Sequence, residues 1–162
     1  MLKDQRELLL AFNACRVKFL LIGGHALGRY TEPRVTGDMD LFVAISEENA
    51  ERVFSALAQF GAPLANYSTA DFQDPYSGFQ IGIKPQQIDL IFAITGVTFD
   101  EAWTNSVEGV TEDGIAVRYL GADDFISNKN AVGRLQDLAD VEAVLAARRA
   151  NKLNHDTEEP LS

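Results

Sequence analysis

Two aspartates at the start of an apolar run are the first residues of this sequence that could do chemistry. The run reads DMDLFV at positions 38–43. Side chains two positions apart on a strand point to the same face, so Asp38 and Asp40 should stand together while Met39 turns into the core. Two like charges this close are costly unless a divalent cation lies between them. The spacing therefore predicts a metal site, for Mg²⁺ or Mn²⁺, on Asp38 and Asp40.

A third carboxylate, Asp89, interrupts a second apolar run, QIDLIF at positions 87–92. Its apolar neighbours should face one side of that strand and Asp89 the other, which could turn it into the same cleft as Asp38 and Asp40. Three such acids can hold two metal ions, one on a triphosphate and one on an attacking hydroxyl. Asp89 is also the natural general base. A competing interpretation makes it a charge that protects an edge strand against aggregation.

A glycine pair precedes the first two acids and would serve a phosphate group. Gly23 and Gly24 end the apolar run FLLI at positions 19–22. Residues without Cβ let the backbone approach a ligand closely and present N–H groups to phosphate oxygens. A helix that begins directly after Gly24 would add its N-terminal dipole. Neither His25 nor His155 is predicted to be a ligand, since the first can pack in the glycine turn and the second lies near the C-terminus.

An alternation of helices and strands must position these acids. Apolar residues at helical or strand spacing, separated by capping and turn signals, mark the elements. The predicted helices are 4–16, 25–30, 46–60, 98–105 and 122–150, with a break near Gly133, and the predicted strands are 17–22, 39–45, 79–84, 88–94, 107–110 and 115–120. The third and fourth strands should form an antiparallel hairpin, as should the fifth and sixth. Positions 63–77 are rich in small and turn-forming residues and are predicted to be irregular.

Composition favours one ordinary globular domain. The chain has 162 residues, of which 46% are hydrophobic and 23% are charged. We expect a single domain over residues 1–151 and a polar, flexible tail over residues 152–162. The 14 basic and 24 acidic residues give a net charge of −10, which disfavours a long polynucleotide partner. The lone Cys15 and the lack of a signal peptide or a long apolar run predict a cytoplasmic protein without a membrane span.

The combined pattern resembles the nucleotidyltransferase superfamily, in which Gly-Gly or Gly-Ser is followed by Asp-x-Asp and then by a third Asp. The matching residues are Gly23-Gly24-His25-Ala26, Arg34, Thr36, Asp38, Asp40 and Asp89. Over residues 17–94 the sequence looks like bacterial AbiEii-type toxin-like and related nucleotidyltransferases, and lincosamide and aminoglycoside nucleotidyltransferases share its Gly-Gly and Asp-x-Asp region. The resemblance implies an α+β fold with a nucleotidyltransferase-like mixed β-sheet, flanking helices and a helical C-terminus.

The same resemblance implies a reaction. A nucleoside monophosphate group would move from a nucleoside triphosphate to an acceptor hydroxyl, with release of pyrophosphate and with Mg²⁺ or Mn²⁺ as cofactor. The catalytic and metal-binding residues would be Asp38, Asp40 and Asp89, and the nucleotide-binding residues would be Gly23, Gly24, Arg34, Thr36 and Lys129. Near Lys129 the superfamily tends to carry Arg-x-Lys-Asp-x-x-Asp, and Gln136 replaces its second basic residue. Helical spacing equally allows Lys129, Arg134, Asp137 and Asp140 to be a solvated, ion-paired face.

The acceptor is open at this stage. It could be a small molecule or a protein hydroxyl, and tRNA is not excluded. A second hypothesis keeps the fold without turnover, as a binding or regulatory module with a cognate toxin–antitoxin partner. A third, a glycosyltransferase with a metal-binding Asp-x-Asp, would normally need a larger nucleotide-sugar domain.

Overall fold

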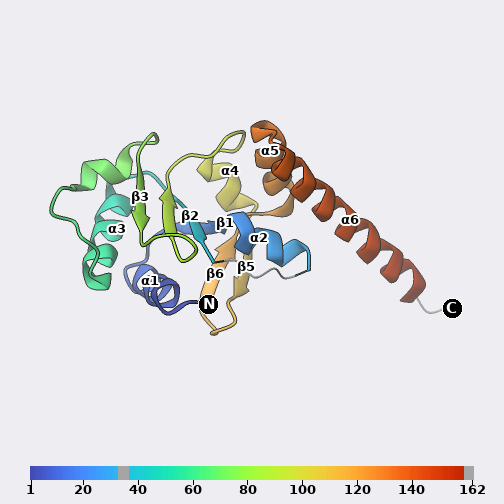
Figure 1. The fold of residues 1–162 in the computed structure, drawn as a ribbon, viewed down its shortest axis with the longest axis horizontal. Helices are drawn as coiled ribbons and strands as arrows, with labels where there is room; N and C mark the ends of the chain where they lie inside the picture. Colours follow the sequence, from blue (N-terminus) through green and yellow to red (C-terminus); the bar gives the residue numbers. More distant parts are fainter. Residues whose placement is uncertain (33–36, 159–162) are drawn as a thin grey trace.

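The computed structural model describes residues 1–32 and 37–158 of the chain, with side chains through Lys152. Within these residues the helices and strands alternate along the chain, with one short 3-10 helix, η1 (Figure 1). In chain order they are α1 (Lys3–Ala14), β1 (Phe19–Ile22), α2 (Gly23–Tyr30), β2 (Met39–Val43), α3 (Glu47–Phe60), η1 (Thr69–Gln73), β3 (Gly78–Ile81), β4 (Ile88–Ile91), α4 (Phe99–Thr104), β5 (Val107–Val110), β6 (Ala116–Tyr119), α5 (Ala122–Val132) and α6 (Leu135–Glu158).

The strands of the described chain form one mixed sheet in the order β3-β4-β2-β1-β6-β5. The two predicted hairpins are present, because β3 pairs with β4 and β5 with β6, each antiparallel. In the centre β1 runs antiparallel to β2, whereas β2 and β4 are parallel, as are β1 and β6. The predicted α+β fold with a mixed sheet and a helical C-terminus is therefore confirmed.

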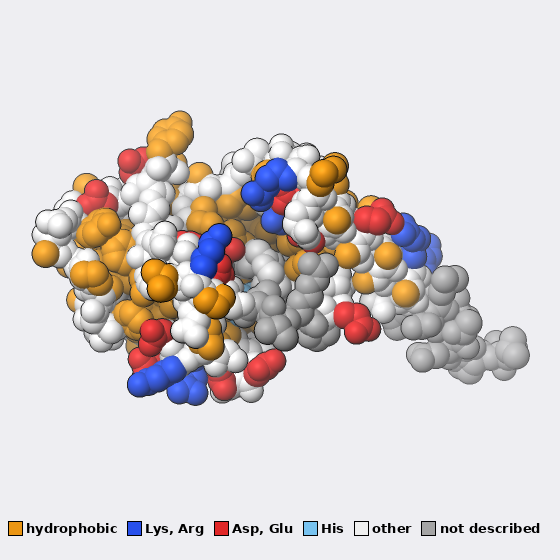
Figure 2. All heavy atoms as spheres, in the orientation of Figure 1, with side chains coloured by type: hydrophobic (Ala, Val, Ile, Leu, Met, Phe, Trp, Pro, Cys, Tyr) orange, Lys and Arg blue, Asp and Glu red, His pale blue; other side chains and the backbone are white. Residues whose placement is uncertain are grey.

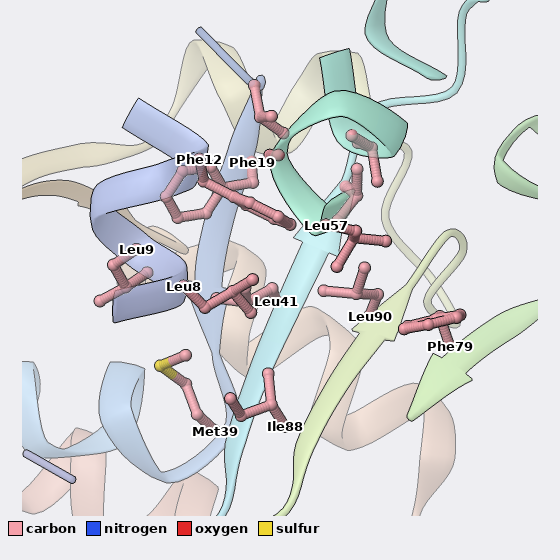
Figure 3. Close-up of a cluster of buried hydrophobic side chains, with 14 of the residues drawn as sticks. Leu8, Leu9, Phe12, Phe19, Met39, Leu41, Leu57, Phe79, Ile88 and Leu90 are labelled. Carbon is pink, nitrogen blue, oxygen red and sulfur yellow. The ribbon is translucent and has the colours of Figure 1, made fainter. Parts of the chain in front are cut away.

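One face of the sheet is covered by α1 and α3 (Figure 1). The side chains of Met39, Leu41, Ile88 and Leu90 project from β2 and β4 into the core between the sheet and these helices (Figure 3). Each of these side chains is at most 1% exposed. Burying an aliphatic side chain of this size stabilises a fold by about 1.5–3 kcal/mol. These contacts fix which residues of β2 and β4 face inward on this side.

The opposite face has its own apolar cluster with α2, α4, α5 and α6. From the sheet it receives Leu20, Ile22 and Phe42, which alternate with the residues of the first cluster. Residues of opposite parity along β2 and β4, including Asp40 and Asp89, belong to this second face. Asp38, one residue before β2, has the same parity as Asp40.

Capping residues explain where α3 begins and ends. The Ser46 side chain accepts a hydrogen bond from the backbone N–H of Asn49, and the helix ends at Gly61, whose φ of 93° suits glycine.

The buried Asn49 side chain links the start of β1 to the end of β2. Its amide donates to the carbonyls of Lys18 (3.2 Å) and Ala44 (2.8 Å), and its oxygen accepts from the N–H of Lys18 (2.8 Å). This side chain holds the entry to β1 against the exit from β2.

Several element boundaries differ from the sequence prediction by a few residues, and three segments differ in ways that affect the fold. The segment predicted to be irregular contains η1, which inserts the buried Phe72 beneath the sheet edge. The second helix begins at Gly23 rather than His25, so both glycines lie in its first turn. The predicted break near Gly133 is present, but α6 continues to Glu158, through most of the segment predicted as a tail.

The last helix projects away from the rest of the molecule toward the C-terminus (Figure 1). Its N-terminal part contacts α5 and α2. Among the described residues, no helix combines the length and the apolar character that crossing a membrane requires.

Candidate active site

The acid site begins with two aspartates paired across neighbouring parallel strands. Asp40 of β2 is in register with Asp89 of β4. On the other side of β2, Asp40 is in register with Ile22, the last residue of β1. The three strands therefore bring Asp40 and Asp89 to the place where β1 ends and α2 begins, as the strand alternation predicts.

At Gly23 the backbone comes close to the Asp40 carboxylate. This glycine has a φ of 64°, and a Cβ built on it would meet Oδ2 of Asp40 at 2.5 Å. A side chain at this position would force the Asp40 carboxylate to move, and the positive φ disfavours any residue other than glycine. Gly23 also starts α2, so the N-terminus of that helix lies directly against the Asp40 carboxylate. The short distance to Asp40 thus explains why the first residue of the pair, Gly23, is a glycine.

The three acids interact electrostatically. The pKa of Asp40 is raised from 3.8 to about 6, first by burial and then by the negative charges of Asp89 and Asp38. A side-chain hydrogen bond with Asp89 adds to the rise, and the positive charge of Lys129 opposes it. A carboxyl pKa raised in this way is typical of acids crowded into one site. Asp38, Asp40, Asp89 and Lys129 therefore belong to one electrostatic neighbourhood.

Gln87 is a site residue that the sequence reasoning missed. Its side-chain amide donates to both carboxylate oxygens of Asp89, at 2.8 and 2.7 Å. Its backbone N–H donates to Oδ1 of Asp38 at 3.0 Å, and its carbonyl accepts from the N–H of Met39 at 2.9 Å. The only available signal in the sequence was its place two residues before Asp89, which puts it on the same side of the strand.

His25 lies in the first turn of α2, next to the backbone of Asp38. Burial lowers its pKa, and a hydrogen bond to the backbone of Asp38 opposes that effect in part. Its Nε2 is buried and has no hydrogen-bond partner among the described residues. The side chain thus fastens the first turn of α2 to the residue that precedes β2.

Lys129 reaches the site from the end of α5. Its Nζ lies 3.4 Å from Oδ1 of Asp137, and the Lys129 side chain is 18% exposed. Asp137 also accepts from Nε of Arg134 at 2.7 Å. Hydrogen bonding by Arg134 is the main reason that the pKa of Asp137 falls to about 2. Asp140 is buried too and accepts from the amide of Gln136 at 2.8 Å.

The ion-paired interpretation of this segment holds for Asp137, which pairs with Lys129 and with the exposed Arg134, but the two acids are not solvated. Asp137 and Asp140 are 1% and 8% exposed, so they face inward rather than water. Gln136, where the superfamily pattern has a basic residue, instead bonds a buried acid. Two of the predicted nucleotide-binding residues, Arg34 and Thr36, lie outside the described residues.

The described side chains contain no group of three or more His, Cys, Asp or Glu residues already arranged to hold a metal ion. Asp40 and Asp89 face each other, whereas one oxygen of Asp38 is directed at the Gln87 N–H. Gln87 donates hydrogen bonds to two of these acids, Asp38 and Asp89.

Elsewhere, a groove of about 590 Å³ lies at the opposite end of β1, lined in part by Val17, Trp103, Val110 and Arg118. It is separate from the acids. The face of the molecule in Figure 2 carries acidic and basic side chains in scattered positions and no continuous basic patch.

A mixed α+β sheet with strand aspartates beside a Gly-Gly helix start defines a protein with a nucleotidyltransferase-like fold. The chain belongs to the family described as "nucleotidyl transferase of unknown function (DUF2204)", whose model matches residues 1–159. No curated protein matches the chain. The superfamily resemblance is thereby confirmed, while the narrower likeness to AbiEii-type, lincosamide and aminoglycoside enzymes stays a prediction.

Proposed function

We propose that this protein is a metal-dependent nucleotidyltransferase that moves a nucleoside monophosphate group from a nucleoside triphosphate to an acceptor hydroxyl. The observation that carries the proposal is the register pair of Asp40 and Asp89 against the helix start at Gly23. Acids placed beside a backbone that approaches closely enough to meet phosphate oxygens suit a metal–triphosphate substrate.

The residues fit Mg²⁺ or Mn²⁺ by donor chemistry. Both ions prefer carboxylate oxygen, and Asp38, Asp40 and Asp89 supply it. The raised pKa of Asp40, caused by burial and by its acidic neighbours, is the electrostatic cost that a divalent cation would relieve. A bound cation would clamp the triphosphate and lower the pKa of the attacking hydroxyl.

The chain's own groups supply the remaining steps. The N–H groups at the start of α2, from Gly23 and Gly24, would face the phosphate oxygens, and the Lys129 ammonium would balance their charge. Arg34 and Thr36 are proposed to join them on the basis of the family pattern. Asp89 would accept the proton of the acceptor hydroxyl while the oxygen of that hydroxyl bonds to the α-phosphorus. The bond from that phosphorus to the bridging oxygen breaks, and pyrophosphate leaves.

The acceptor is proposed only by class: a hydroxyl of a small molecule or a protein, with tRNA as a further candidate. The net charge of −10 argues against long nucleic acids. A cytoplasmic location suits an enzyme that uses nucleoside triphosphates.

The test is a transfer assay. The protein is incubated with Mg²⁺ or Mn²⁺, a cell extract and each nucleoside triphosphate labelled at the α-phosphate. We expect label on an acceptor, no transfer from a γ-labelled nucleotide, and loss of transfer in Asp40→Asn and Asp89→Asn. Asp113→Asn, which changes an exposed carboxylate in the β5–β6 turn, is the matched control.

Calorimetric measurement of nucleotide binding distinguishes the proposed enzyme from a non-catalytic module. Nucleotide binding without any transfer would contradict the proposed reaction and favour a non-catalytic module with a toxin–antitoxin partner. Transfer that survives Asp40→Asn would contradict the assignment of the acids.

A further inference from the structure

Gln87 donates three hydrogen bonds to carboxylate oxygens of the acid site. Its backbone already ties β4 to β2 through the N–H of Met39 and the carboxylate of Asp38. Its side-chain amide adds two further bonds, both to Asp89 and one to each carboxylate oxygen. The amide therefore occupies the very atoms that a metal ion would need.

We propose that Gln87 is a displaceable latch on the acid site: its side-chain amide holds the carboxylate of Asp89 in the free protein and gives way when a divalent cation binds. The proposal rests on the proposed function, because it assumes that Asp89 is a metal ligand. It assigns Gln87 as a positioning residue, acting through Asp89.

The physical reason is a competition between the amide and a cation for the same two carboxylate oxygens. Asp89 faces Asp40 across the parallel pair, so its charge needs a donor when no cation is present. An NH₂ group supplies two donors and no charge. It can hold the Asp89 carboxylate in position in the free protein, and it releases the oxygens to a stronger partner at the cost of hydrogen bonds alone.

In the free protein, two of the three acids are directed at Gln87. Asp38 is directed at the backbone of Gln87 and Asp89 at its side chain. Rotation of the Gln87 side chain would free Asp89 without moving β4, because the register of β4 is set by Ile88 and Leu90 on the opposite face.

The first experiment measures Mn²⁺ binding without nucleotide, from the loss of the free-ion EPR signal. Gln87→Leu keeps the approximate size of the side chain and removes both donors. We expect it to bind Mn²⁺ about tenfold tighter than the unaltered protein, the change that matches the loss of competing hydrogen bonds to a charged group. Gln86→Leu, at the neighbouring exposed position of the same hairpin, should leave the affinity unchanged.

A residue that only supports the fold would give the opposite sign, because loosening the site would weaken binding. Unchanged or weaker Mn²⁺ binding in Gln87→Leu overturns the latch and leaves the proposed function intact. If neither protein binds Mn²⁺, the latch is also overturned, and the transfer assay decides separately whether the proposed function fails.

A second measurement uses the unaltered protein and keeps the proposal testable if Gln87→Leu does not fold. The side-chain NH₂ signals of Gln87 are followed by NMR during titration with Mg²⁺. We expect them to shift toward the position of a solvent-exposed amide as the site fills. Signals that stay in place at saturating Mg²⁺ would rule the latch out.

Discussion

Replacing Asp40 with asparagine should make the protein more stable while removing its activity. Asp40 has a pKa raised from 3.8 to about 6, mainly by burial and then by its acidic neighbours. The folded protein therefore holds this proton more tightly than the unfolded chain does. As pH rises from about 4 to 6 the folded state loses this advantage, and above 6 the buried charge is a full cost.

The magnitude follows from the shift. A rise from 3.8 to about 6 corresponds to about 3 kcal/mol for a carboxyl without solvent contact, and partial exposure reduces this to about 1–2 kcal/mol. Asparagine keeps the shape and carries no charge. For a chain of this length the gain should raise the melting temperature by about 3–6 °C at pH 8.

The assay is guanidinium unfolding followed by the fluorescence of Trp103, the single tryptophan, whose ring stacks on Phe99 at 6.0 Å. Measurements at pH 4, 6 and 8 should show the advantage of Asp40→Asn absent at the lowest pH and complete at the highest. The control, Asp113→Asn, should show no such dependence. A variant that is less stable at pH 8, or equally stabilised at pH 4, would refute the electrostatic account of the site.

Three further substitutions test other parts of the structure. Gly23→Ala should abolish transfer and destabilise the fold by about 1–3 kcal/mol, because the new Cβ would meet Asp40 at a positive φ. The control is Gly114→Ala, where φ is also positive, at 79°, but the space around the glycine is open. Thermal melts should therefore show a smaller loss of stability for Gly114→Ala. Asn49→Ala should cost about 2–3 kcal/mol in chemical denaturation, since it leaves buried backbone groups of Lys18 and Ala44 without their partner; equal stability would show that water replaces the amide. Asp137→Asn should lower stability at pH 7, because a pKa depressed to about 2 by Arg134 stabilises the fold above pH 4 and loses that effect as pH falls toward 2; a difference that persists in acid-unfolding curves at pH 2 would contradict the ion-pair explanation.

Much of the acid site could be predicted because it depends on local alternation. The pattern around Asp40 and Asp89, with apolar neighbours on both sides, is enough to place each carboxylate on the face opposite the main core. The glycine pair likewise predicts that the backbone comes close to another group, and the structure identifies Gly23 as the position where a Cβ would meet the Asp40 carboxylate.

The contacts of Gln87 and the burial of Asp137 could not be predicted in the same way. Gln87 meets Asp38 only because β4 pairs with β2 in parallel, an arrangement between segments 49 residues apart. Asp137 is buried because the turn at Gly133 brings the start of α6 against α5, where Lys129 lies. Helical spacing alone shows such residues as neighbours without showing which side faces the protein.

One face of β4 packs in the core, while the other carries Asp89, so the strand is held in place independently of the surface around the acids. Ile88 and Leu90 anchor the strand from below, beneath α1 and α3. The tip of the β3–β4 hairpin, residues 82–86, is exposed, but Pro85 lies tightly against Gly37, the residue before Asp38. The side chains at positions 83 and 84 could therefore be changed while Asp89 keeps its alignment with Asp40, whereas a change at Pro85 would disturb the chain that leads to Asp38.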